Sequence, residues 1–124
     1  KEKKYTEAAE QLLLLNAGSF TPEELTEYEK LRKSIMPDAA KAAYDEGYRL
    51  YNSKKYREAL NKLLRVQVYD PEYRRMDAVY YYLGRCSQFL DDNTSALNYF
   101  QKVVDEYPNS SYVKRAKQQI ERIT

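Results

Sequence analysis

Histidine and tryptophan are absent from the 124-residue sequence, and cysteine occurs once, as Cys86. Without histidine, the chain cannot form a Ser-His-Asp triad, a Cys-His dyad or a Cys₂His₂ zinc site. A single cysteine also cannot form an intramolecular disulfide, so the cysteine content leaves the cellular compartment open. We therefore predict that the chain is not an enzyme and that it holds no catalytic residue, metal ion or cofactor.

Glycine and proline are also scarce, with three and four residues respectively. Such infrequent helix breakers favour long helices over a β fold with many turns, and the abundant Lys, Glu, Ala, Leu, Arg and Gln are good helix formers. The longest purely aliphatic run, residues 12–15, is much shorter than the ~18 apolar residues of a membrane-spanning helix. We therefore predict an all-α domain that makes no membrane contact itself.

Charge of one sign does not accumulate along the sequence, because 21 basic and 19 acidic residues are interspersed and give a net charge of +2. Nucleic-acid-binding domains usually concentrate positive charge on one face. The segment 109–124 leans basic, but the solvated outer face of a terminal helix explains this excess better than a phosphate site. We therefore predict that the chain does not bind nucleic acid.

Two acidic pairs stand out as possible catalytic or metal-binding residues, Glu23–Glu24 and Asp91–Asp92. Both occur at expected turns or helix starts, where carboxylates accept hydrogen bonds from backbone N–H groups and interact favourably with the helix dipole. Cys86 falls within a helical pattern, and we expect it to be a buried, small apolar residue. None of these residues is predicted to carry chemistry.

Five residues recur after an interval of 37 positions, which is the strongest pattern in the sequence. The first copy consists of Gly47, Ala59, Leu63, Val66 and Pro71. The second copy consists of Gly84, Ala96, Phe100, Val103 and Pro108. Four of the pairs are identical and the fifth, Leu63 and Phe100, stays apolar, so we interpret the two segments as copies of one structural unit.

Each residue type in this pattern has a physical role in a pair of antiparallel helices. Glycine inside a helix costs about 1 kcal/mol relative to alanine, so Gly47 and Gly84 predict the close approach of a neighbouring helix, which a side chain would block. The two alanines permit the same tight crossing. Leu63 and Phe100 follow one turn later on the same helix face and fill the interface. The two prolines are expected to end each hairpin and to open the next helix.

The pattern resembles the tetratricopeptide repeat, a helix–turn–helix unit with aromatic, Leu-Gly, Ala, Phe and Pro markers. The better copy consists of Tyr80, Leu83, Gly84, Ala96, Phe100 and Pro108, and the weaker copy of Ala43, Gly47, Leu50, Ala59, Leu63 and Pro71. The sequence departs from the family at Glu46 and Ser87. The resemblance implies that these signature residues are structural, and that the fold is a right-handed superhelical array of antiparallel helix hairpins.

We predict about seven helices, and the clearest start is Thr21-Pro22-Glu23-Glu24, which has the residues of a capping box with proline in the first turn. Pro37 either breaks one long helix or only kinks it, and both possibilities stay open. The family's repeat is about 34 residues long, so the longer interval implies three extra residues, placed at 74–76 within a helix. The predicted helices are 3–16, 22–36, 38–52, 56–69, 72–90, 93–106 and 110–123.

These helices form one predicted solenoid domain with four parts. Residues 1–36 form a truncated or divergent first repeat with a linking helix, and 37–71 and 72–108 form one repeat each. Residues 109–124 form a C-terminal capping helix, since repeat arrays need an end with a polar outer face. Because the sequence starts at Lys1 and not at Met, we expect it to be a piece of a longer protein.

The segment Glu106–Tyr112 resembles bacterial envelope members of the family, such as Tol-Pal accessory proteins and outer-membrane assembly lipoproteins. This resemblance implies a repeat of the bacterial type. It favours the extracytoplasmic part of a membrane-anchored bacterial protein over a cytoplasmic location, although the residues themselves leave the compartment open.

The first helices of successive repeats are expected to line the concave face of the solenoid. On helix 38–52, Tyr44, Tyr48 and Tyr51 lie about 100° from the packing stripe, so we expect them to face this groove. Tyrosine and arginine are favoured at protein interfaces, which makes these positions the predicted partner-binding site. The equivalent positions in the next repeat are Tyr81, Arg85 and Gln88.

An alternative is that tyrosine, with 14 copies, simply fills space in this protein. Tyr44 and Tyr48 could then pack against helix 22–36, while Tyr80 and Tyr82 are expected to be packing residues in either case. Some family members bind the carboxylate tail of chaperones through Lys and Asn in the groove. Here the corresponding positions carry tyrosines, so we do not expect chaperone binding.

The sequence thus favours a non-catalytic scaffold or adaptor that binds a peptide or helix of a partner protein in a tyrosine-rich concave groove. The alternative is a structural spacer or self-association unit of a larger bacterial envelope-associated protein. In that case the N-terminal helix, with the exposed apolar edge expected at residues 12–15, would mediate the self-association.

Overall fold

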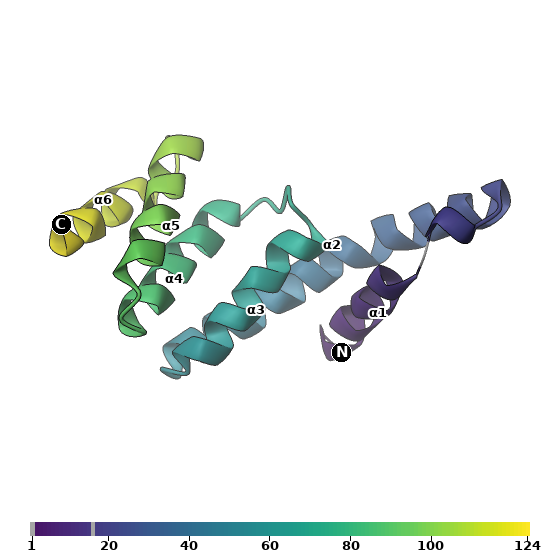
Figure 1. The fold of residues 1–124 in the computed structure, drawn as a ribbon, viewed down its shortest axis with the longest axis horizontal. Helices are drawn as coiled ribbons and strands as arrows, with labels where there is room; N and C mark the ends of the chain where they lie inside the picture. The colour runs from purple at the N-terminus through teal and green to yellow at the C-terminus, as the bar shows by residue number, and fades with distance from the viewer. Residues whose placement is uncertain (1, 16) are drawn as a thin grey trace.

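The computed structural model describes residues 2–15 and 17–124. Within these residues the chain forms six α-helices, one short 3₁₀ helix and no strand, which confirms the all-α prediction. The molecule is elongated, with the start of α2 at one end and α6 at the other (Figure 1). The helices are α1 (Glu2–Leu14), η1 (Ala17–Ser19), α2 (Pro22–Asn52), α3 (Tyr56–Tyr69), α4 (Met76–Phe89), α5 (Asn93–Glu106) and α6 (Val113–Ile123).

Helix α2 begins with the predicted capping box and continues through Pro37, where either a break or a kink was expected. The Thr21 N–H donates to Glu24 Oε1 at 2.9 Å, and the Glu24 N–H donates to Thr21 Oγ1 at 3.2 Å. The helix continues through Pro37, so six α-helices replace the seven predicted. Proline lacks the N–H that would bond the carbonyl four residues earlier. Packing of the buried Met36 and Ala40 on either side holds the two halves in one helix.

Helices α4 and α6 begin later than predicted, at Met76 and Val113 instead of residues 72 and 110. Pro71 and Pro108 therefore lie in the connections and not in the first turn of a helix. Before α4, the N–H groups of residues 73 and 76 each bond a carbonyl three residues earlier, which closes two successive turns. The extra residues placed at 74–76 thus belong mainly to this connection, and placing them inside a helix was wrong.

Helix α1 packs on α2 and is linked to α3 through the Glu10 carboxylate. Ala9 and Leu12 are buried, and Glu10 accepts hydrogen bonds from Arg65 Nε at 2.9 Å and from the Tyr69 hydroxyl. Partial burial by itself raises the pKa of Glu10, but the two hydrogen bonds outweigh it and keep the pKa below its ordinary value. Glu10 is therefore ionised at neutral pH and holds α1 against α3.

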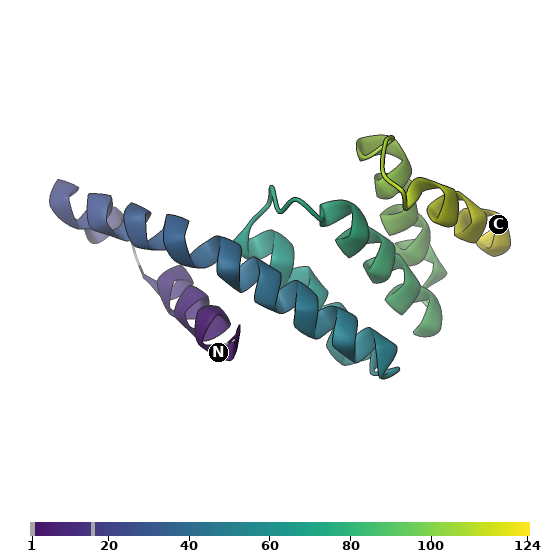
Figure 2. The same cartoon turned by 180° about the vertical axis from the view of Figure 1, so that it is seen from behind.

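The end of α1 and the first half of α2 are the least covered part of the structure. The predicted helix 3–16 is confirmed as far as Leu14, and residue 16 lies outside the described residues. The Leu14 side chain is 78% exposed and the Leu15 side chain 50%, whereas Leu12 is buried and Leu13 half-buried. The apolar edge expected at residues 12–15 is therefore confirmed only for its last two residues. The first half of α2 extends past α3 (Figures 1 and 2).

Two glycine contacts fix how closely the hairpin helices approach. A Cβ atom at Gly47 would lie 2.7 Å from Leu63 Cγ, and one at Gly84 would lie 2.5 Å from Phe100 Cε1. Both distances are shorter than any ordinary carbon–carbon contact. The predicted close approach is thus confirmed, and it occurs at the same place in the α2–α3 and α4–α5 hairpins.

Replacing Gly84 by alanine should lower the free energy of unfolding by about 1 kcal/mol. Over-packing of a core costs about 1–3 kcal/mol, and the higher helix propensity of alanine offsets about 1 kcal/mol of that. Urea unfolding followed by circular dichroism measures the difference. Ser34→Ala, at an exposed position of α2, is the control and should leave the stability unchanged or slightly higher. A Gly84→Ala variant as stable as the original would contradict the close contact.

Candidate functional site

The structure separates the six predicted groove residues by their burial. Tyr48 is 40% exposed, whereas Tyr44 and Tyr81 are buried, with 5% and 8% of their surface exposed. The expectation that Tyr44 and Tyr81 present their rings to a groove was therefore wrong. The remaining three predicted residues are half-buried, namely Tyr51, Arg85 and Gln88.

Residues outside the first helices cover the two buried tyrosines. The Tyr44 ring lies 6.0 Å from the ring of Tyr73, in the α3–α4 connection. The Tyr81 ring lies 5.7 Å from Phe100 and 5.2 Å from Tyr112, which directly precedes α6. The alternative that Tyr44 packs against helix 22–36 is also wrong, because those residues belong to the same continuous helix.

Six tyrosines nevertheless come together between α2, α4 and the start of α6, and we call them the tyrosine cluster. The Tyr82 ring lies 5.1 Å from both Tyr48 and Tyr51, and 5.9 Å from Tyr112. Tyr82 was expected only to pack, and the repeat pattern did not indicate Tyr112. The three consecutive tyrosines at 80–82 could have indicated this cluster, because consecutive residues place their rings on different faces of a helix. The cluster consists of Tyr44, Tyr48, Tyr51, Tyr81, Tyr82 and Tyr112.

A polar network occupies the other end of the predicted site. Arg85 donates to the Tyr51 hydroxyl at 3.3 Å, to Gln88 Oε1 at 2.8 Å and to Gln119 Oε1 at 3.0 Å. Gln88 Nε2 also donates to Gln119 Oε1, at 3.0 Å. The structure therefore brings the half-buried residues of the predicted site together, and it adds Gln119 from α6, which repeat spacing did not indicate.

The three buried phenols of the cluster, those of Tyr44, Tyr81 and Tyr82, have raised pKa values. Burial raises the pKa of Tyr44 and Tyr81 above the ordinary value, and the neighbouring Arg75 and Arg85 oppose this only in part. For Tyr82, burial and a hydrogen bond with Tyr112 act in the same direction and raise its pKa as well. Neutral phenols can both donate and accept hydrogen bonds, so these three residues offer hydroxyl groups without a charge.

Residues 78–110 match the family model of the tetratricopeptide repeat. The match supports a tetratricopeptide repeat in this segment, which contains most of α4, all of α5 and the turn that follows. Comparison with curated proteins gave no match, and neither did comparison with solved structures. The fold of two antiparallel hairpins agrees with a helical repeat array of this family.

The signature residues of the matched repeat lie where they separate helices or fill the space between them. Ala96 and Phe100 of α5 are fully buried, and Leu83 of α4 is 2% exposed. Tyr80 packs near Tyr107, with ring centres 6.1 Å apart. At the position where the sequence departs from the family, the buried Ser87 hydroxyl donates to the Leu83 carbonyl at 2.9 Å. A polar side chain is therefore accommodated there without losing a hydrogen bond.

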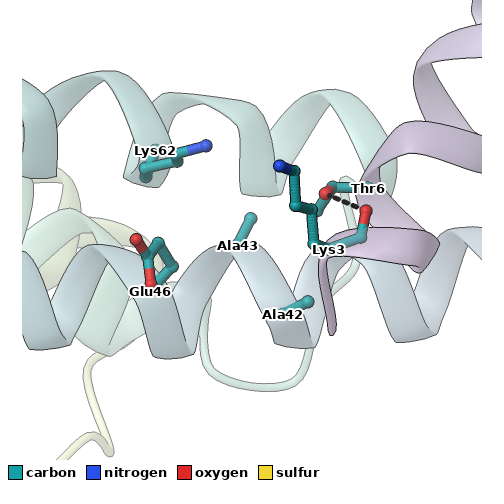
Figure 3. A pocket seen from close by; sticks show the side chains of 6 residues that line it. All are labelled: Lys3, Thr6, Ala42, Ala43, Glu46 and Lys62. Atoms are coloured by element: carbon teal, nitrogen blue, oxygen red, sulfur yellow. Dashed lines mark hydrogen bonds between the residues drawn. The ribbon is translucent and has the colours of Figure 1, made fainter. Parts of the chain in front are cut away.

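A cavity of about 400 Å³ lies between α1, α2 and α3 (Figure 3), and none of the tyrosines lines it. Its one carboxylate, Glu46, accepts a hydrogen bond from Arg49 at 2.6 Å, and this bond lowers the pKa of Glu46 despite partial burial. An ionised carboxylate with its own partner does not form a catalytic arrangement. The lining residues are Lys3, Thr6, Ala42, Ala43, Glu46 and Lys62.

The other candidates for chemistry have structural surroundings. Asp92 Oδ1 accepts from the Ser95 N–H at 3.1 Å as the cap of α5. Cys86 is fully buried, as predicted, and burial raises the pKa of its thiol to about 12, which disfavours the reactive thiolate. In the described part of the chain there is no group of three acidic or cysteine residues placed to bind a metal ion. No helix within those residues is long and apolar enough to cross a membrane.

The burial of the cluster predicts unequal losses of stability for two neighbouring tyrosines. Tyr44→Ala should lower the free energy of unfolding by about 3 kcal/mol, because it opens a cavity in the core. Tyr48→Ala removes a ring that is 40% exposed and should cost about 1 kcal/mol. Urea unfolding of both variants checks the difference. Equal losses would show that the two rings are equally buried, contrary to the structure.

Proposed function

We propose that this chain is a non-catalytic scaffold or adaptor, which binds a peptide or helix of a partner protein on the tyrosine cluster. A tetratricopeptide repeat in general indicates a protein–protein interaction module, and the choice of surface is our addition. The observation that carries this choice is the exposure of Tyr48, whose ring is 40% exposed while the rings of Tyr44 and Tyr82 beside it are buried.

An exposed ring on a buried aromatic support has the properties of a binding hot spot. The ring centres of Tyr44 and Tyr82 lie 6.3 Å and 5.1 Å from that of Tyr48, so the side chain is already held in place. Binding then costs little additional side-chain entropy. A tyrosine ring offers a large apolar area together with a hydroxyl group, and tyrosine is enriched among residues that dominate binding energy.

The same proposal includes the order of the repeats and the handedness of their array. We propose that the hairpins 37–71 and 72–108 are successive repeats of a right-handed superhelix, flanked by the partial repeat 1–36 and the cap 109–124, with the cluster on the concave side. The recurrence of the glycine contact after 37 residues supports the register. The bacterial envelope type rests on the resemblance of Glu106–Tyr112.

Affinity capture with the immobilised chain tests the surface. Tyr48→Ala should reduce the recovery of partner proteins from a bacterial lysate about tenfold, which corresponds to the loss of about 1.4 kcal/mol at a hot spot. Leu64→Ala and Val68→Ala are matched controls, because these α3 side chains are 40% and 41% exposed. They should leave recovery unchanged. Undiminished recovery with Tyr48→Ala, or equal losses for all three variants, would contradict the proposal.

Self-association is the second candidate, and the exposure of α1 favours it. Beside the exposed Leu14, an open cavity of about 690 Å³ lies between the end of α1 and the first half of α2, and its lining includes Leu15, Phe20 and Leu31. Exposed apolar patches of this kind mark sites of protein association. A second copy of the chain could cover these side chains.

Sedimentation equilibrium distinguishes this second candidate. If the patch mediates self-association, the chain should form a dimer at high concentration, and Leu14→Glu combined with Leu15→Glu should make it monomeric by placing unpaired charges in the interface. Leu64→Glu, on the similarly exposed surface of α3, should leave the dimer intact. A chain that is monomeric at all concentrations would rule this candidate out.

A further inference from the structure

Three arginines border the tyrosine cluster, and each lies over an aromatic ring. A guanidinium that lies over a ring is attracted by the ring electrons and can still form hydrogen bonds through N–H groups in its own plane. The guanidinium groups come from the residue before α4, from α4 itself and from α6. The pairs are Arg75 over Tyr44 at 5.1 Å, Arg85 over Phe89 at 4.9 Å and Arg115 over Tyr112 at 5.0 Å.

These arginines have no acidic partner among the residues that the structure describes. By contrast, Arg49 and Arg65 each lie 2.6 Å from a carboxylate oxygen, of Glu46 and Glu10 respectively. Arg85 donates to neutral tyrosine and glutamine oxygens. Three guanidinium groups beside the cluster therefore have no carboxylate of the described residues within ion-pair distance.

Carboxylates that lie close to the cluster already have other partners. Asp45 Oδ2 lies 2.7 Å from Lys41 Nζ, and Asp77 Oδ2 accepts from the Ser110 hydroxyl at 2.6 Å. The charge of Arg85 also acts on the cluster. It lowers the pKa of Tyr81, although burial raises that pKa by a larger amount. Three guanidinium groups therefore border the aromatic cluster.

We propose that the tyrosine cluster receives a carboxylate-rich segment of the partner protein, which Arg75, Arg85 and Arg115 bind through charge-assisted hydrogen bonds. This inference rests on the proposed function and specifies the chemistry of the partner. Arginine binds carboxylates with two parallel N–H groups, and aromatic stacking orients those groups in advance. Apolar side chains of the same segment would contact the exposed ring of Tyr48.

A peptide fits these observations better than a nucleic acid does. A protein that binds a phosphate backbone needs a continuous basic stripe, whereas three separate arginines suit a few carboxylates. Three of the six rings of the cluster are buried and only that of Tyr48 is exposed, so the cluster offers no row of open ring faces on which successive bases could stack. The partner segment is therefore expected to carry Asp or Glu together with apolar residues.

Selection from a phage-displayed library of random linear peptides tests the proposal. Peptides bound by the unmodified chain should be enriched in Asp and Glu, and their affinity should fall as salt concentration rises. Arg75→Gln and Arg115→Gln should each weaken a selected peptide about tenfold, since a charge-assisted hydrogen bond contributes roughly that factor. Both side chains are exposed, so thermal melts should show that the variants remain folded.

Two further variants test whether binding depends on the planar shape of the Arg115 guanidinium or only on the net charge of the chain. Arg115→Lys keeps the charge but loses the planar group, and it should also weaken binding. Arg32→Gln, at an exposed position of α2 remote from the cluster, makes the same change in charge as Arg115→Gln and should have no effect. Equal weakening by Arg32→Gln would show that only net charge matters, and would overturn the proposal.

The outcomes also distinguish failure of this inference from failure of the proposed function. Selected peptides that depend on Tyr48 but show no acidic enrichment would overturn the inference and leave the proposed surface intact. Peptides insensitive to both Tyr48→Ala and the arginine variants, or no selected peptide at all, would overturn both. Tighter binding of a single-stranded oligonucleotide than of the selected peptides would also overturn the choice of an acidic protein segment.

Discussion

Both hairpins depend on a contact between a glycine in one helix and a large apolar side chain in the next. Gly47 faces Leu63 and Gly84 faces Phe100, so closely that a methyl group in place of either glycine hydrogen would overlap its partner. The close approach lets fully buried side chains fill the space between the helices. The first helix of each hairpin therefore contains a glycine, which disfavours helix formation by about 1 kcal/mol relative to alanine.

This constraint also determines where the tyrosines meet. The tight hairpins keep each second helix close to its first, and successive first helices then lie near enough for the rings of Tyr48 and Tyr51 to reach Tyr82. Most of these rings stabilise the array, and only the outermost remain available to a partner. A surface formed in this way is rigid before binding, which favours affinity because little conformational entropy is lost on association.

The helical class, the capping box and the glycine contacts could be predicted from the sequence, because each depends on residues close together or on a repeated spacing. The continuity of α2 could not, since a proline's local cost was outweighed by packing of Met36 and Ala40, which only the tertiary structure reveals. The burial of Tyr81 was missed for the same reason. Its cover comes from Tyr112, far along the chain, and helix periodicity describes only the helix in which a residue lies.

The most direct test of the central claim is a double-mutant cycle on one glycine contact. Gly47→Ala should destabilise the original chain, but in a Leu63→Ala background the added methyl group meets open space, so the same change should become neutral or stabilising by up to about 1 kcal/mol. The free energies of unfolding of the four proteins give the coupling. An equal destabilisation by Gly47→Ala in both backgrounds would contradict the account, since the glycine would then not be required by its contact with Leu63.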